Sequence, residues 1–451
     1  MTDHATRRSL PPGEAAGSKH LPALFGLLTA LAMLAYPVLF FAVRGGMDWT
    51  FSLLALLSLY GLARYGAAGN VWDRPSVAYA AAMASWMLAL AVSEIAHARF
   101  MLKPYDNALA LVFTIPVYQF ARRVGVRALA TVQYGFCLGA ITAAAVLHWA
   151  PKDWGNGRPG SYFLNPIHYG DVALVTGVLA FFSIDWTGTD SRALRALKTL
   201  ALIAGLYASL RTGSRGGWVA IPAFIALWLY KQRGKFPRAG VAVLLAALIG
   251  LSLAAYAFLP WIHHRIADIY TNLAAYRHGH ENTAVGIRFQ IWKAALLLWR
   301  QHPLFGVGPG YLYKEHMHAL GQIGYITPMA AQFGVAEVHN QVLAVTVKLG
   351  IAGLVSVLSL YAVPFALFAR SANSPVGTRR VGGVLGMALV IGFFIYGLTV
   401  ETFDLKMTAV FYGMTVAILL AAASHRPIAS DAAAGAIPAD SSGSTDRPRT
   451  H

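Results

Sequence analysis

Long apolar stretches separated by short polar connections recur along most of the chain. The hydrocarbon core of a bilayer is about 30 Å thick, and a helix needs about 20 apolar residues to cross it. By this criterion the pattern predicts about twelve membrane-spanning helices and an all-α polytopic integral membrane protein. The expected spans are Leu21–Val43, Trp49–Ala63, Ser76–Ile95, Asn107–Ala121, Ala128–Trp149, Gly170–Trp186, Ala196–Leu210, Trp218–Tyr230, Ala239–Leu259, His339–Phe368, Val381–Val400 and Met407–Ala423.

The same pattern divides the chain into five parts. A polar segment, 1–20, precedes nine spans in 21–259, and three further spans occupy 339–423. Between these groups, residues 260–338 are too polar to span a membrane and long enough for a small domain with helices of its own. Residues 424–451 are rich in Ala, Ser, Pro and Asp, which predicts a disordered tail. The first apolar stretch is too long for a signal-peptide core, so we expect an uncleaved first span.

The distribution of Lys and Arg predicts the orientation, because cytoplasmic loops carry an excess of both. With a cytoplasmic N-terminus, alternate connections place their basic residues inside the cell. These residues are Arg7, Arg8, Lys19, Arg64, Arg74, Arg122, Arg123, Arg127, Arg192, Arg195, Lys198, Lys231, Arg233, Lys235, Arg238, Arg370, Arg379 and Arg380. An even number of spans returns the C-terminus to the cytoplasm. Residues 260–338 then face the periplasm if the cell is Gram-negative.

Composition supports a membrane protein and excludes several classes of function. The chain is 57% hydrophobic and 12% charged over 451 residues, which is difficult to reconcile with a soluble protein of this size. Its net charge of +17 is scattered between apolar blocks, so it does not indicate a nucleic-acid partner. Cys137 is the single cysteine, which excludes a disulfide framework.

The connection between the seventh and eighth spans combines arginines with glycines. Arg211 and Arg215 lie on the expected outer side, where orientation rules do not call for basic residues. Gly213, Gly216 and Gly217 allow positive φ and a close approach of the backbone to a ligand. Arginine near a bilayer is energetically costly, so the stretch favours an anion site such as one for phosphate. The alternative is a short loop whose arginines reach lipid headgroups.

Several polar residues, Glu337, His339 and Asn340 among them, lie at the start of the tenth span. His339 has a side chain whose unperturbed pKa of about 6.5 suits a proton acceptor near neutrality. Glu337 or Asn340 could orient its ring. The alternative is an interfacial histidine whose nitrogens are satisfied by water or headgroups.

Two further stretches on the expected outer side carry weaker signals. Arg288 and Trp292 share a face of an amphipathic helix, followed by the glycine-rich 306–310 and Tyr311. Gly-Lys-Ser and Gly-Lys-Thr are absent, so 306–310 is interpreted as a structural turn rather than a P-loop. The fifth connection contains His168 in Asn-Pro-Ile-His-Tyr-Gly-Asp, which could close over a sugar or form an ordinary turn.

Absent motifs narrow the chemistry. The sequence contains no Asp-x-Asp and no His-Glu-x-x-His, and its acidic residues are too sparse to favour a glycosidase carboxylate pair. We therefore expect no metal and no cofactor. Arginine and histidine together fit a phosphate-bearing donor that leaves as an anion, with one base for an incoming hydroxyl.

Residues 211–217, the Arg288–Trp292 helix with 306–311, and His339-Asn340 followed by 349–354 together resemble the O-antigen ligase and polymerase superfamily. The resemblance covers about 150–360. It implies a metal-independent, inverting glycosyltransferase of the inner membrane with a periplasmic active site. The implied donor is an O-antigen polysaccharide on undecaprenyl pyrophosphate, and the implied acceptor is lipid A-core. The resemblance also implies that His339 is the catalytic base, that Arg215 and Arg288 bind pyrophosphate, and that Arg211 supports them.

Three alternatives remain open at the level of the sequence. The polymerase of the same superfamily joins repeat units to each other, and an oligosaccharyltransferase moves a lipid-linked glycan onto protein serines or threonines. A flippase would bind the same lipid pyrophosphate without breaking it. Transporters often contain repeated halves with broken helices, and no clear internal repeat is visible here.

Overall fold

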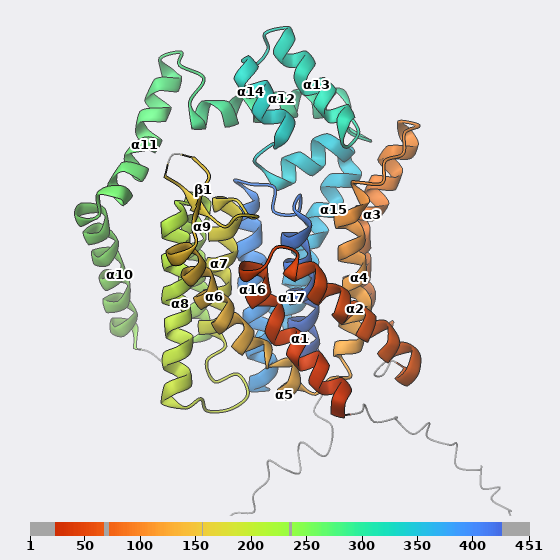
Figure 1. The fold of residues 1–451 in the computed structure, drawn as a ribbon, viewed down its shortest axis with the longest axis vertical. Coiled ribbons are helices and arrows are strands. Elements are labelled where there is room, and N and C mark those ends of the chain that lie inside the picture. The colour runs from red at the N-terminus through yellow and green to blue at the C-terminus, as the bar shows by residue number, and fades with distance from the viewer. Residues whose placement is uncertain (1–22, 67–71, 156, 234–236, 426–451) are drawn as a thin grey trace, which may run out of the picture.

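The computed structural model describes residues 23–66, 72–155, 157–233 and 237–425, and nearly all of them are helical (Figure 1). Within these ranges the β-structure consists of one short hairpin, β1 (Lys152–Asp153) paired antiparallel with β2 (Pro159–Gly160). The predicted all-α fold class is confirmed. The predictions for residues 1–20, for 426–451 and for Lys235 fall outside the described residues.

A helix occupies the position of each predicted span. These helices are α1 (Ala23–Ala42), α2 (Gly46–Tyr65), α3 (Arg74–Ala96), α4 (Tyr105–Ala121), α5 (Val126–Leu129) continued by α6 (Val132–Trp149), α7 (Pro166–Phe182), α8 (Arg192–Thr212), α9 (Arg215–Lys231), α10 (Arg238–Phe258), α15 (Gln341–Ala372), α16 (Gly377–Gly397) and α17 (Lys406–Ser424). Eight helical segments among the described residues are long and apolar enough to cross a membrane, namely α1, α2, α3, α5 with α6, α8, α15, α16 and α17. The chain is therefore a multi-pass membrane protein.

The bundle is held together by close helix contacts and by hydroxyl pairs in its interior. Gly177 on α7 faces Gly205 on α8, where an added Cβ at Gly205 would lie 2.5 Å from the Ala173 carbonyl oxygen. Small residues of this kind let helices approach in a membrane, where no hydrophobic effect drives them together. Tyr36 and Thr415 are both buried, and their hydroxyls form a hydrogen bond of 3.0 Å with each other. Neither hydroxyl is therefore left without a hydrogen-bond partner in the apolar interior.

Residues 260–336 form four helices outside the predicted spans, α11 (Pro260–Arg277), α12 (Ala284–Gln301), α13 (Tyr311–Gln322) and α14 (Pro328–Ala336). Helices α12 to α14 share a second hydrophobic core that includes Ile291, Met317 and Ala330. Threonine side chains cap the first turns of two of them, as Thr283 does by accepting from the Gly286 amide at 3.0 Å. This part of the chain therefore packs around apolar side chains of its own.

Helices α12 to α14 lie at one end of the bundle, whereas α1 begins and α17 ends at the opposite end (Figure 1). The predicted even number of spans would place the two ends of the chain on the same side in this way. The assignment of the two ends to periplasm and cytoplasm stays a prediction.

Helix α15 is interrupted at Gly350, whose φ of 65° and ψ of −150° are not helical. The chain before the break contributes Ala344 and Val347 to the core of α12 to α14. The tenth predicted span is thus two helical pieces rather than one continuous helix, a feature that the apolar pattern alone did not reveal. Only glycine fits here, because a Cβ would also lie 2.3 Å from the Leu304 carbonyl oxygen.

The glycine-rich 306–310 stretch and the residues just before it fill this break. The Val307 amide donates to the Val347 carbonyl at 2.9 Å, and the Gly308 amide donates to the Lys348 carbonyl at 3.0 Å. The Ile351 amide in turn donates to the Pro303 carbonyl at 2.9 Å. Non-helical backbone at membrane depth is tolerated only where its polar groups find partners. The stretch therefore has the structural role that the sequence indicated.

Candidate functional site

The connection from α14 to α15 holds His339 in a constrained backbone conformation. His339 has a φ of 58°, in the left-handed region that residues other than glycine seldom adopt. Asn340 follows as the N-cap of α15 and accepts from the Leu343 amide at 3.0 Å. A strained backbone conformation persists only where the surrounding structure stabilises it, and such conformations are frequent at functional sites.

Glu337 lies beside His339. The Nδ1 atom of His339 is 3.4 Å from Oε2 of Glu337, an ion-pair distance slightly longer than a normal hydrogen bond, and both side chains are mostly buried. Burial raises the pKa of Glu337, but His339 and the Glu401 amide, which donates to Glu337 Oε1 at 2.8 Å, outweigh it and lower the pKa to about 2. Glu337 is therefore a carboxylate at neutral pH. His339 Nδ1 is buried and makes no hydrogen bond among the described residues, so the nearby negative charge of Glu337 favours a proton on this nitrogen. That tautomer leaves Nε2 as the nitrogen that can accept a proton.

Glu401, which the sequence analysis did not select, supports the same connection from the loop between α16 and α17. Its Oε1 accepts from the Val338 amide at 2.6 Å, and its Oε2 accepts from Lys348 Nζ at 2.8 Å. The residue is only 3% exposed. A carboxylate between two apolar stretches, in a chain with 19 acidic residues, was the signal that could have identified it.

His168 approaches the site from the first turn of α7. Its Nε2 lies 3.3 Å from the Glu401 carbonyl oxygen, and its Nδ1 lies 3.1 Å from Asn165 Oδ1. Asn165 also caps α7, accepting from the Ile167 and His168 amides at 3.0 and 3.1 Å. We define the His339 cluster as Glu337, His339, His168, Glu401 and Lys348.

Arg288 brings a guanidinium to the cluster from α12. Burial lowers its pKa, and the charge of Glu337 opposes that shift. Its Nε is buried and has no hydrogen-bond partner among the described residues. Trp292, one turn further along α12, donates from Nε1 to the Val338 carbonyl at 3.1 Å and so holds the helix against the connection. The predicted shared face of these two residues is the face toward the cluster.

Arg215 begins α9, on a turn that abuts the same loop. Gly213 ends α8 with a φ of 65°, and the Ser214 hydroxyl donates to Asp171 Oδ1 at 2.5 Å. A Cβ on Gly216 would lie 2.3 Å from Thr399 Oγ1, so the start of α9 touches the loop that carries Glu401.

The structure thus brings most of the predicted site residues into one region. Glu337, His339 and His168 belong to the cluster, Asn340 caps α15 beside it, Arg288 interacts with Glu337, and Arg215 lies on an adjoining turn. Arg211 and Tyr311 are exposed, and none of the contacts among described residues joins either side chain to the cluster. The described residues hold no group of three or more His, Cys, Asp or Glu that could bind a metal ion.

The arrangement combines a polarised imidazole with cations on neighbouring elements. An imidazole held by a carboxylate can remove a proton from a hydroxyl. A guanidinium near it can stabilise negative charge that develops on a departing phosphate group. This chemistry suits transfer of a group from a phosphate-linked donor.

Comparison with known proteins gives two matches. Residues 200–358 match the Wzy_C family, described as O-antigen ligase. An uncharacterized protein of Haemophilus influenzae is 25% identical over 304 residues, which cover 65% of this chain and 73% of that protein. The family match includes Arg215, Arg288 and His339 but ends before Glu401 and begins after His168.

Proposed function

We propose that the protein is an O-antigen ligase. Residues 200–358 match the O-antigen ligase family, and this similarity supports a membrane enzyme of the glycosyl-transfer type. The proposed reaction moves O-antigen polysaccharide from undecaprenyl pyrophosphate to lipid A-core during lipopolysaccharide biosynthesis. The observation that carries the proposal is the pairing of His339 with Glu337 beside Arg288, because all three residues lie within the segment that matches the family.

In the proposed reaction His339 is the general base. Its Nε2 takes the proton of an acceptor hydroxyl as that oxygen attacks the anomeric carbon of the donor sugar. The bond from this carbon to the pyrophosphate oxygen breaks, its electron pair leaves with the pyrophosphate, and the configuration inverts. A positioned base typically contributes about 100- to 10,000-fold to the rate. Glu337 stabilises the imidazolium that forms.

Arg288 and Arg215 are the proposed ligands of the pyrophosphate, with Arg211 as a support at the end of α8. Charge-assisted hydrogen bonds contribute about 1.5 to 3 kcal/mol each, and they strengthen as negative charge grows on the leaving group. No metal or cofactor has a part in this mechanism.

The proposed location is the inner membrane, with the active site on the periplasmic side and both termini in the cytoplasm. The cluster belongs to the end of the bundle that carries α12 to α14, opposite the start of α1 and the end of α17 (Figure 1). The polyprenyl tail of the donor would remain in lipid while its pyrophosphate reaches the cluster.

A deletion strain complemented with His339→Ala, Arg215→Ala or Arg288→Ala tests the proposal. We expect each variant to lose long chains from lipid A-core while lipid-linked polymer accumulates. Matched controls are His318→Ala on α13 and Arg277→Ala at the end of α11, both at exposed positions outside the cluster. Near-normal ligation in His339→Ala would remove this histidine from the mechanism.

The same strains separate the alternatives. Loss of chain elongation, rather than of attachment, would identify a polymerase. Loss of glycan from protein, with intact lipopolysaccharide, would identify an oligosaccharyltransferase. Retention of the lipid-linked glycan on the cytoplasmic side would identify a flippase.

A further inference from the structure

At the end of the bundle opposite the His339 cluster, a cavity of about 610 Å³ lies where α7 and α9 end and α16 begins. Its walls differ in character. Phe181 and Trp228 belong to the apolar side, whereas Lys231, Arg233 and Arg380 supply positive charge. Among the described residues of the lining Asp185 is the one carboxylate, so these residues carry two more positive than negative charges.

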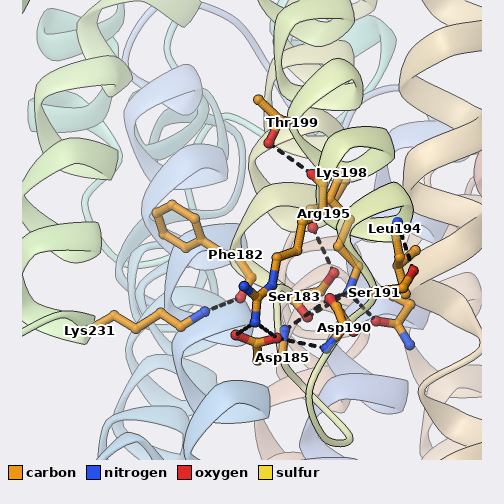
Figure 2. A network of polar contacts seen from close by, with 12 residues as sticks. Phe182, Ser183, Asp185, Asp190, Ser191, Leu194, Arg195, Lys198, Thr199 and Lys231 are labelled. Carbon is orange, nitrogen blue, oxygen red and sulfur yellow. Dashed lines mark hydrogen bonds and ion pairs between the residues drawn. The ribbon is translucent and has the colours of Figure 1, made fainter.

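The connection from α7 to α8 forms one side of this cavity and is held by a network of polar contacts (Figure 2). Lys198 is fully buried and pairs with Asp190 at 2.7 Å, while its Nζ also donates to Gln133 and to the Ser183 carbonyl. The Asp190 amide donates to Asp185 Oδ1 at 2.8 Å. A buried ion pair with this many partners fixes the connection rather than leaving it adaptable.

The single carboxylate of the lining is already engaged. Arg195 donates to both oxygens of Asp185, at 3.1 and 3.2 Å. This pairing comes from α8, outside the residues that line the cavity. Among the described residues Arg233 and Arg380 form no ion pair with a carboxylate, so these two guanidiniums leave the lining with an excess of positive charge.

Two of the cations are oriented by contacts at the rim. Arg233 stacks on the Tyr230 ring, with Cζ 4.4 Å from the ring centroid, and donates to Asn373 Oδ1 at 2.9 Å. Arg380 donates to the Ser374 carbonyl at 3.4 Å. A guanidinium has five N–H donors in a planar fork, so one acceptor fixes its direction and leaves a face that matches phosphate oxygens.

We propose that this cavity binds the phosphate headgroup of an anionic phospholipid from the leaflet at that end of the bundle. Arg233 and Arg380 hold the phosphate beside Lys231, whose Nζ donates to the Phe182 carbonyl (Figure 2), and the first carbons of the acyl chains lie along Trp228 and Phe181. Basic pockets between the ends of membrane helices suit such headgroups, because each Lys or Arg near an anionic surface contributes to binding. Inorganic phosphate shares the charge chemistry but lacks the chains.

The test uses the full-length protein in neutral detergent, with thermal unfolding measured during titration with phosphatidylglycerol, phosphatidylcholine or inorganic phosphate. We expect phosphatidylglycerol alone to raise Tm strongly. In Arg233→Gln/Arg380→Gln its apparent affinity should fall about 25-fold, at about fivefold for each charge removed. The matched control Arg127→Gln/Arg192→Gln removes two exposed charges at the same end but outside the cavity, and its affinity should change less than twofold.

Two results would overturn the proposal. One is an equal response of the cavity variant and the control variant to phosphatidylglycerol. The other is a response to inorganic phosphate that phosphatidylglycerol does not exceed, which would assign the cavity to a free anion. If the double variant does not fold, each single variant, Arg233→Gln and Arg380→Gln, should lose about fivefold, and retention within twofold by both contradicts the site.

Discussion

At the scale of single residues, the candidate site depends on carboxylates in a chain that has few of them. Glu337 orients His339, and Glu401 holds the backbone between them through the Val338 amide. Each carboxylate accepts a hydrogen bond from a residue more than 60 positions away in the sequence. Glu401 accepts from the Val338 amide, and Glu337 accepts from the Glu401 amide. The proposed catalytic histidine is therefore positioned by a loop on another part of the chain.

The low pKa of Glu337 predicts a pH dependence of stability. Its pKa falls from an ordinary value of 4.5 to about 2 in the folded protein, so its contribution is present above pH 4.5 and is lost as the pH falls toward 2. A shift of this size corresponds to about 3 kcal/mol. Glu337→Gln should be less stable than the parent at pH 7, and about three quarters of that difference in the free energy of unfolding should be lost at pH 2.5, as measured by chemical unfolding. A difference that stays constant with pH would contradict this account.

The ion pair of Lys348 with Glu401 predicts non-additive substitutions. Removing one partner leaves the other charge mostly buried, which costs about 3 to 5 kcal/mol. Lys348→Met and Glu401→Gln should each lower Tm, whereas the double variant should be more stable than either single variant. Additive losses in the double-mutant cycle would show that the pair is not coupled.

At the scale of elements, the part of α15 before its break at Gly350 connects α12 to α14 with the bundle. Residues before Gly350 pack with α12 to α14, and residues 303–308 supply the hydrogen bonds that the break removes. The glycines of both stretches were visible in the sequence. Their mutual contact was not, because more than 40 residues separate them.

The substitution Gly350→Ala tests the role of the break in α15. The added Cβ would meet the Leu304 carbonyl oxygen in a backbone region that alanine avoids, so we expect a loss of about 2 kcal/mol or more. Gly250→Ala on α10 is the control, since a Cβ there meets nothing within 4 Å and alanine favours a helix by up to about 1 kcal/mol. Thermal unfolding of both variants measures the contrast, and equal behaviour would refute the role of the break.

At the scale of the whole molecule, the two ends of the bundle differ in charge and content. One end carries the His339 cluster and α12 to α14, and the other carries the basic cavity and the network around Lys198. The distribution of Lys and Arg predicts that the second end is cytoplasmic.

Cysteine accessibility tests this orientation. Cys137 is buried, so it leaves a low background. Lys314→Cys on α13 and Thr189→Cys between α7 and α8 place thiols at exposed positions of opposite ends. A membrane-impermeant thiol reagent that reaches the periplasm should label Lys314→Cys in intact cells and label Thr189→Cys only after lysis. The reverse result would invert the topology.

The sequence by itself determined the helical class, the position of each apolar helix and most residues of the candidate site. Apolar length and residue chemistry are local properties, so they can be read directly from the chain. Arg288 and His339 could be selected because a guanidinium and an imidazole are unusual on the expected outer side. The selection of Arg211 and Tyr311 rested on the same local reasoning, and the fold leaves both exposed.

Only the tertiary structure decided which of these groups meet. The partnership of Glu401 with Lys348 and Val338, the approach of His168, and the insertion of 303–308 into the break at Gly350 all join distant parts of the chain. Such contacts follow from how helices pack and from where buried polar groups find partners. Those are properties of the assembled bundle, and no local pattern of residues specifies them.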